Sequence, residues 1–123
     1  MEKLPALNNE ALKVYSLQPE LIAQTALQII KDFNGYGIEL SFNDITINAY
    51  EELHHNIEPV VKKLLGNNAS LLMELLYRID IKESALSNDT VAQNESASGK
   101  ITRLIIYREL QKVVTRNYFR KLQ

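Results

Sequence analysis

Residues 100–123 read KITRLIIYRELQKVVTRNYFRKLQ. Apolar side chains recur here at the spacing of one face of an α-helix, so the segment predicts a long amphipathic helix over residues 100–121. The expected apolar face is wide enough for a bundle core. Its members are Ile106, Tyr107, Leu110, Val113, Val114 and Tyr118. Ile101 and Phe119 fall nearer the charged side, so we expect both to be exposed unless something covers them.

The same segment is strongly basic. Residues 100–123 contain seven basic residues and one acid, a net charge of +6, whereas residues 1–99 carry −7. Four of the bases recur at intervals of four and are expected to form one ridge about 18 Å long. This basic ridge consists of Arg108, Lys112, Arg116 and Arg120. Such an asymmetry of charge bears on the partners of a protein rather than on its fold.

Three interpretations of the basic ridge compete. In the first, it pairs within the molecule with Glu51, Glu52, Glu58 or Glu74, where each exposed pair contributes about 0–1 kcal/mol. In the second, the ridge and Phe119 bind another protein or a second copy of the chain, giving a homo-oligomer. In the third, the ridge binds the phosphates of a nucleic acid. The sequence pI of about 6.1 disfavours that third interpretation.

Local signals predict three further helices. The first covers residues 19–34, with a proline at its first position and a glycine-containing turn after it. The second covers residues 43–65, where Pro59 is expected to produce a kink or to divide the segment into two helices. The third, over residues 69–81, is apolar around more than half its circumference and is expected to be the most buried, central helix. Residues 9–16 show a weaker pattern, compatible with a short helix or an extended segment.

These segments predict an all-α fold: a single helical domain over residues 1–123, built as a four-helix bundle with a kinked second helix. A fifth helix is added if residues 9–16 are helical. Residues 84–98 are small and polar without a sustained period, so we expect a flexible connection before the last helix. The apolar fraction of 46% and the charged fraction of 24% are ordinary for a globular protein.

The sequence predicts neither a membrane span nor secretion. No apolar run reaches the roughly 18 residues that a transmembrane helix requires. The first residues, Met1 to Pro5, lack the pattern of a signal peptide, so we expect a cytoplasmic location. The chain has no cysteine, which excludes thiolate nucleophiles and cysteine-ligated metals.

Signals for catalysis or metal binding are weak. Glu51, His54, His55 and Glu58 lie within one side of the 43–65 helix, and Glu51-x-x-His54 has the spacing of ligands in di-iron bundles. Such a site needs a second copy of the motif, and the chain has only two histidines. A mononuclear site stays open, although a solvated polar face is the favoured interpretation. We therefore expect no catalytic residue, metal or cofactor.

The resulting functional hypothesis is a non-enzymatic interaction protein. It would self-associate or dock a protein partner through its C-terminal helix, using the basic ridge and Phe119. The alternative is an accessory protein that binds nucleic acid through the same ridge. No motif in the sequence specifies the partner.

Overall fold

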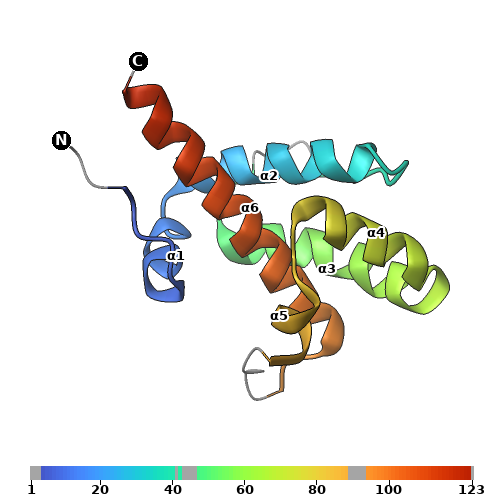
Figure 1. Cartoon of the computed structure of the whole chain (residues 1–123). Helices are drawn as coiled ribbons and strands as arrows, with labels where there is room; N and C mark the ends of the chain where they lie inside the picture. The colour runs from blue at the N-terminus through green and yellow to red at the C-terminus, as the bar shows by residue number, and fades with distance from the viewer. Residues whose placement is uncertain (1–3, 41, 43–46, 89–93, 123) are drawn as a thin grey trace.

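The computed structural model describes residues 4–40, 42, 47–88 and 94–122 of the chain. Within these residues all regular secondary structure is α-helical, which confirms the all-α fold class. The helices are α1 (Asn9–Tyr15), α2 (Pro19–Asn34), α3 (Tyr50–Asn67), α4 (Ala69–Ile79), α5 (Glu83–Asn88) and α6 (Ala97–Lys121) (Figure 1). None of these described helices combines the length and the apolar composition needed to cross a membrane.

Local residue chemistry explains where several helices begin and end. The side chains of Asn8 and Ser96 each accept a hydrogen bond from a backbone N–H in the first turn of α1 and α6, respectively. Pro19 occupies the first position of α2, so the bounds of this helix match the predicted 19–34. In the turn after α2, Gly37 has φ +73°, a conformation that residues with a Cβ atom rarely adopt.

A single residue separates α3 from α4. The backbone N–H of Asn68 donates to the Leu64 carbonyl at 2.8 Å, and the non-helical φ of −153° at Asn68 ends α3. Its side-chain Oδ1 accepts a hydrogen bond from Leu71 N at 3.2 Å and thereby caps the start of α4. The two helices are therefore joined directly, with one asparagine serving both ends.

The start of α3 differs from the prediction of a helix over 43–65. Residues 43–46 lie outside the described residues, and Ala49, in an extended conformation with φ −131°, precedes the first turn. α3 continues past Pro59 as one helix, so the predicted alternative of two shorter helices is wrong. Pro59 is exposed, and water can therefore bond the carbonyl that the missing N–H leaves unpaired. The kink, and the arrangement as a four-helix bundle, stay predictions.

The stretch predicted as a flexible connection, residues 84–98, contains most of a short helix. α5 occupies Glu83–Asn88, and α6 begins at Ala97, ahead of the predicted start at Lys100. The Lys100 ammonium donates to the Leu86 carbonyl, which ties α5 to α6. Residues 89–93 lie outside the described residues, so the flexibility of this stretch stays a prediction.

α6 is the central helix of the fold. It crosses α2 and α3 (Figure 1) and also contacts α1 and α4. Ile105 and Ile106 of α6 join the main apolar core, while Leu110 and Val114 pack with Leu12 of α1 in a second cluster. The other buried members of the main core are Ile22, Ala26, Ile29, Phe33, Ile38, Ile47, Leu53, Ile57, Val61, Leu72, Leu75, Leu76 and Ile79.

The prediction that residues 69–81 would form the most buried helix is wrong. One face of α4 is buried against the core, whereas Met73 and Tyr77 on its other face are 42% and 86% exposed. A helix can be rich in apolar residues and still lie at the edge of a fold, because composition does not specify how many neighbours cover it. α6 is the more enclosed helix, and even its charged Glu109 is buried.

Candidate interaction surface on the last helix

The basic ridge begins with an arginine that is paired within the molecule. Arg108 NH2 lies 3.1 Å from Oδ2 of Asp80, the residue that ends α4, and Arg108 NH1 donates to Gln111 Oε1 at 3.2 Å. The Asp80 side chain is 67% exposed, so this ion pair contributes only about 0–1 kcal/mol to stability. Arg108 therefore helps to orient α4 on α6, and its charge is already opposed.

The second ridge residue lies beside a buried acid. Lys112 Nζ is 3.0 Å from Oε1 of Glu109, one turn earlier on α6, and Glu109 is fully buried. The pKa of Glu109 is raised to about 8, mainly because burial disfavours its charged form. The carboxyl group of Asp32 on α2 raises this pKa further, and the Lys112 ammonium opposes both effects. The Lys112 ammonium therefore contacts a residue of its own helix and does not point freely into solvent.

The third ridge residue contacts α2 through a neutral side chain. Arg116 NH1 donates to Gln28 Oε1 at 3.0 Å, and Gln28 Nε2 donates to Asp32 Oδ1 at 3.2 Å. Arg116 is exposed, and the amide that it contacts does not oppose its charge. Arg116 therefore reaches α2 near Asp32, whereas Lys112 contacts Glu109 of its own helix.

The last ridge residue has a different environment. Arg120 is exposed, as is the adjacent Lys121, and in the described part of the chain Arg120 forms no ion pair. Phe119 is 51% exposed, as expected, and lies edge-on to Tyr118 with ring centroids 5.3 Å apart. Ile101, at the other end of α6, is partly covered by the main core. The exposed cations and the exposed aromatic ring thus coincide only in the last turns of α6.

In the contacts that the structure describes, the acids predicted to face the basic ridge are not its partners. The described contacts of Arg108, Lys112 and Arg116 are made with residues of α2, of α6 itself and of the end of α4. Among the predicted acids, Glu51 and Glu74 are exposed. Pairing within the molecule was one of the three interpretations, but the acids named for it were wrong, because helix packing geometry decides which of the many carboxylates is near.

A groove of about 640 Å³ lies beside the exposed end of α6. It is bounded by the segment before α1, the end of α1, the start of α2 and the last turns of α6. Its apolar and aromatic wall residues are Pro5, Tyr15, Leu21, Val114 and Tyr118. Arg120 and Lys121 also line it, with Glu20 of α2 as an acidic member. We call this the C-terminal groove; it combines an apolar and aromatic wall with polar residues and two cations.

A second groove, of about 560 Å³, lies between α1, the α4–α5 junction and the middle of α6. It is lined by Arg103, Tyr107 and Arg108, among others. Arg103 forms a two-pronged ion pair with Glu95, with distances of 2.9 and 3.0 Å, and Arg108 pairs with Asp80. Both guanidinium groups are therefore already paired with carboxylates of the same chain, which leaves this groove a weaker candidate for an anionic ligand.

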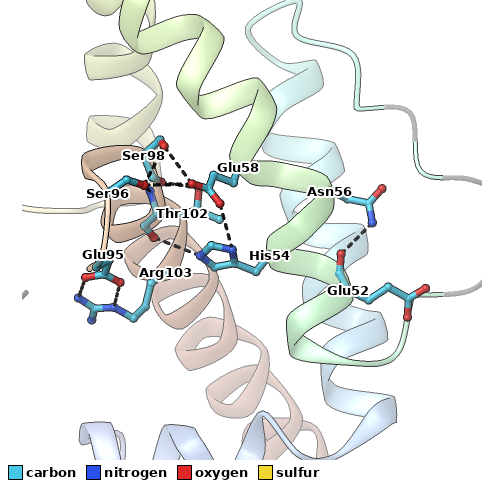
Figure 2. A network of polar contacts seen from close by, with 10 residues as sticks. Glu52, His54, Asn56, Glu58, Glu95, Ser96, Ser98, Thr102 and Arg103 are labelled. Atoms are coloured by element: carbon cyan, nitrogen blue, oxygen red, sulfur yellow. Dashed lines mark hydrogen bonds and ion pairs between the residues drawn. The ribbon is translucent and has the colours of Figure 1, made fainter. Parts of the chain in front are cut away.

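The most connected polar cluster lies where α6 begins on α3 (Figure 2). Glu58 Oε2 accepts hydrogen bonds from Ser96 Oγ at 3.1 Å and from Ser98 Oγ at 3.0 Å. Ser96 Oγ also caps the helix by accepting from Gly99 N at 3.0 Å. A carboxylate at this place is favourable because the N-terminus of a helix carries a partial positive charge. The cluster therefore explains how the start of α6 is fixed.

His54 completes this cluster without forming a catalytic triad. Its Nε2 lies 3.2 Å from the Gly99 carbonyl oxygen, and its Nδ1 lies 3.7 Å from Glu58 Oε1 (Figure 2). A bond to a carbonyl requires the proton on Nε2, so the nitrogen that would activate a serine is already a donor. Ser98 moreover donates to Glu58 and not to His54. The arrangement caps a helix and lacks the relay that nucleophilic catalysis needs.

The four residues considered as metal ligands are not gathered into one site. His54 and Glu58 face the start of α6, whereas Glu51 and His55 are exposed. Among the residues that the structure describes, no three histidine or carboxylate side chains are placed to hold one metal ion. His54 and Glu58 instead hold the start of α6 on α3.

Two features of α6 were not anticipated. The first is that Glu109 is buried, although it is the sole acid of a basic segment. The sequence pattern does indicate this burial, because Ile106 and Val113 lie three residues before and four after Glu109 and so share its helix face. The second is the link from Glu58 to Ser96 and Ser98, which no sequence pattern indicates, since it joins residues 38 and 40 positions apart.

Comparison with protein-family models, with curated proteins and with solved structures finds no match for this chain.

Proposed function

We propose that this chain is a non-enzymatic interaction protein that docks a protein partner through the C-terminal groove and the last turns of α6. The observation that carries the proposal is the environment of Arg120, which is exposed and has no ion-pair partner among the described residues. Phe119 and Leu122 beside it are 51% and 56% exposed. Exposed apolar side chains next to uncompensated charge are typical of interaction sites.

The chemistry of the groove favours an acidic segment that carries a large apolar side chain. Tyr15, Leu21 and Tyr118 offer an apolar surface to that side chain, and Arg120 and Lys121 offer charge to neighbouring carboxylates. Burial of the apolar group supplies affinity, and the charges raise the association rate and select against basic partners.

Nucleic-acid binding is less well supported than protein docking. Arg108 lies 3.1 Å from Asp80 and Lys112 lies 3.0 Å from Glu109, so half of the basic ridge is already engaged within the molecule. The charge left for phosphates is concentrated at one end of α6, around Arg116 and Arg120. A short cluster of this kind is a smaller electrostatic footprint than the continuous ridge that the sequence predicted.

The proposal is tested with synthetic peptides in which Glu and Asp flank a pair of Leu or Phe residues. Fluorescence anisotropy is expected to show binding that is lost in the double variant Arg120→Glu, Lys121→Glu and weakened in Phe119→Ala. The matched control is Lys62→Glu, Lys63→Glu, which makes the same change of charge at exposed positions of α3. Peptides with serine in place of the apolar pair are expected to bind poorly.

Two further measurements test whether a second copy of the chain or a nucleic acid binds this surface instead. A native mass above 14.1 kDa that falls in the Arg120→Glu, Lys121→Glu variant would assign the groove to a second copy of the chain. Binding of mixed-sequence DNA or RNA that collapses between about 50 and 200 mM salt would assign the ridge to phosphates. A monomer that binds neither peptides nor nucleic acid would overturn the proposal.

A further inference from the structure

Two acidic side chains face each other in the interface between α2 and α6. Glu109 of α6 is fully buried and Asp32 of α2 is 9% exposed, and the two helices are in direct contact. Asp32 lies within hydrogen-bonding reach of Glu109. Their neighbours along the chain, Phe33 and Leu110, are buried in the apolar interior. Two ionised carboxylates in such surroundings would repel each other and lose their hydration.

The polar groups around the pair do not fully neutralise it. Lys112 Nζ lies 3.0 Å from Glu109 Oε1, yet within the described residues neither oxygen of Glu109 accepts a well-aligned hydrogen bond. Asp32 accepts one hydrogen bond from Gln28, which is itself held by Arg116. A proton placed between the two carboxyl groups would supply the missing hydrogen bond and remove the repulsion.

We propose that Glu109 and Asp32 form a proton-dependent latch between α2 and α6. One proton shared by the two carboxyl groups keeps the helices packed, and loss of this proton loosens the interface. The latch is independent of what binds the C-terminal groove, because it requires only the buried pair. It gives the protein a stability that depends on pH in the neutral range.

The charged groups around the latch determine the direction of this dependence. On α2 and α6, Asp32 favours the protonated form of Glu109 and Lys112 disfavours it. On the other helices that contact α6, Asp80 at the end of α4 is held by Arg108, and His54 and Glu58 of α3 face the far end of α6 near Gly99. The α1 contact with α6 centres on apolar residues.

The sign of the effect follows from proton binding. The pKa of Glu109 is raised from 4.5 to about 8 in the folded protein, so between these two pH values the folded state holds a proton that the unfolded chain has released. The stabilisation is fully present below pH 4.5 and falls as the pH rises towards 8. The equilibrium constant for unfolding is expected to rise by up to about tenfold per pH unit in this window.

The test combines a site-specific titration with a neutral variant. Carbon-13 NMR of the side-chain carboxyl carbons in the wild-type protein should show Glu109 titrating near pH 8, in a position assigned with the Glu109→Gln variant. Denaturant unfolding between about pH 5 and 9 should show that Glu109→Gln loses the rise of up to about tenfold per pH unit in the equilibrium constant for unfolding. Glu74→Gln, at an exposed position of α4, is the matched control and should retain it.

A second variant isolates the contribution of Asp32 to the titration of Glu109. Asp32→Asn should lower the pH at which Glu109 titrates, because it removes the negative charge and leaves a neutral group in reach. Titration of Glu109 below about pH 5.5 in the wild-type protein would overturn the proposal, as would equal pH dependence in Glu109→Gln and the wild type. The Glu109 carboxyl carbon can also be assigned in the wild type through its correlation with the backbone resonances, so the wild-type titration decides the matter even if a variant fails to fold.

Discussion

Ser98 Oγ at the start of α6 donates a hydrogen bond of 3.0 Å to Glu58 Oε2 on α3. The same carboxylate oxygen accepts a bond from Ser96, the capping residue of α6. One glutamate thus anchors the first turn of the central helix to another helix of the core. The position of α6, and with it the geometry of its far end, depends on this contact.

Removal of this carboxylate should destabilise the fold measurably. Glu58→Ala leaves two hydroxyl groups without their acceptor and removes a negative charge from the helix N-terminus, so we expect a loss of about 1–3 kcal/mol in the free energy of unfolding. Urea unfolding followed by circular dichroism measures the loss. Glu51→Ala, at an exposed position of the same helix, is the control and should change the stability by less than about 0.5 kcal/mol. Equal effects of the two changes would contradict this role of Glu58.

Two glycines should respond in opposite directions to the same substitution. Gly66 lies within α3, and a Cβ atom added there would meet nothing within 4 Å, so Gly66→Ala should stabilise the protein by about 0.5–1 kcal/mol. Gly37 also has open space around it, but its φ of +73° disfavours alanine, and Gly37→Ala should destabilise by about 1 kcal/mol. Thermal unfolding of both variants tests this, and a shift of the same sign in both would refute the conformational explanation.

Neighbouring residues on α4 should differ sharply in their tolerance of alanine. Leu76 is 1% exposed and Leu76→Ala creates a core cavity, for which we expect a loss of about 2–5 kcal/mol. Tyr77 is 86% exposed, and Tyr77→Ala should change the stability by less than about 0.5 kcal/mol. Denaturant unfolding distinguishes the two. A large loss from Tyr77→Ala would mean that the outer face of α4 is covered, for instance by a second copy of the chain.

Lys112 should tune the pH range over which the protein loses stability. The Lys112 ammonium lowers the pKa of Glu109, so Lys112→Gln should raise that pKa above its wild-type value of about 8. Because Glu109 then keeps its proton to higher pH, the decline in stability should extend further into the alkaline range. The measurement is unfolding at a series of pH values, with Lys62→Gln, at an exposed position of α3, as the control. A window that moves to lower pH in Lys112→Gln would contradict the assigned direction.

The sequence predicted those parts of the fold that local chemistry determines. α2 has the predicted bounds because Pro19 and the glycine turn act within a few residues of the helix ends. α5 was missed because a helix of six residues has too few positions to show a period. The central place of α6 was missed for another reason: the number of neighbours around a helix follows from packing between distant segments, which no local pattern records.

The candidate site was predictable only in its composition. The exposure of Phe119 and the basic character of α6 follow from the sequence, since both depend on positions around one helix. Which ridge residues are paired within the molecule does not follow from the sequence. Arg108 contacts Asp80, 28 positions away, and Arg116 contacts Gln28, 88 positions away. Sequence reasoning can therefore locate charge on a helix, but the tertiary structure decides which charges are left for a partner.

Asn68 ends α3 and caps α4, so no connecting loop separates these two helices, which both contribute to the core. An extra residue inserted at this junction would rotate α4 by about 100° about its own axis, because an α-helix has 3.6 residues per turn. Leu72 and Leu76 would then turn away from the core. Glu74 and Arg78 would turn towards it. In natural or designed versions of this chain, the number of residues between α3 and α4 is therefore expected to be under constraint.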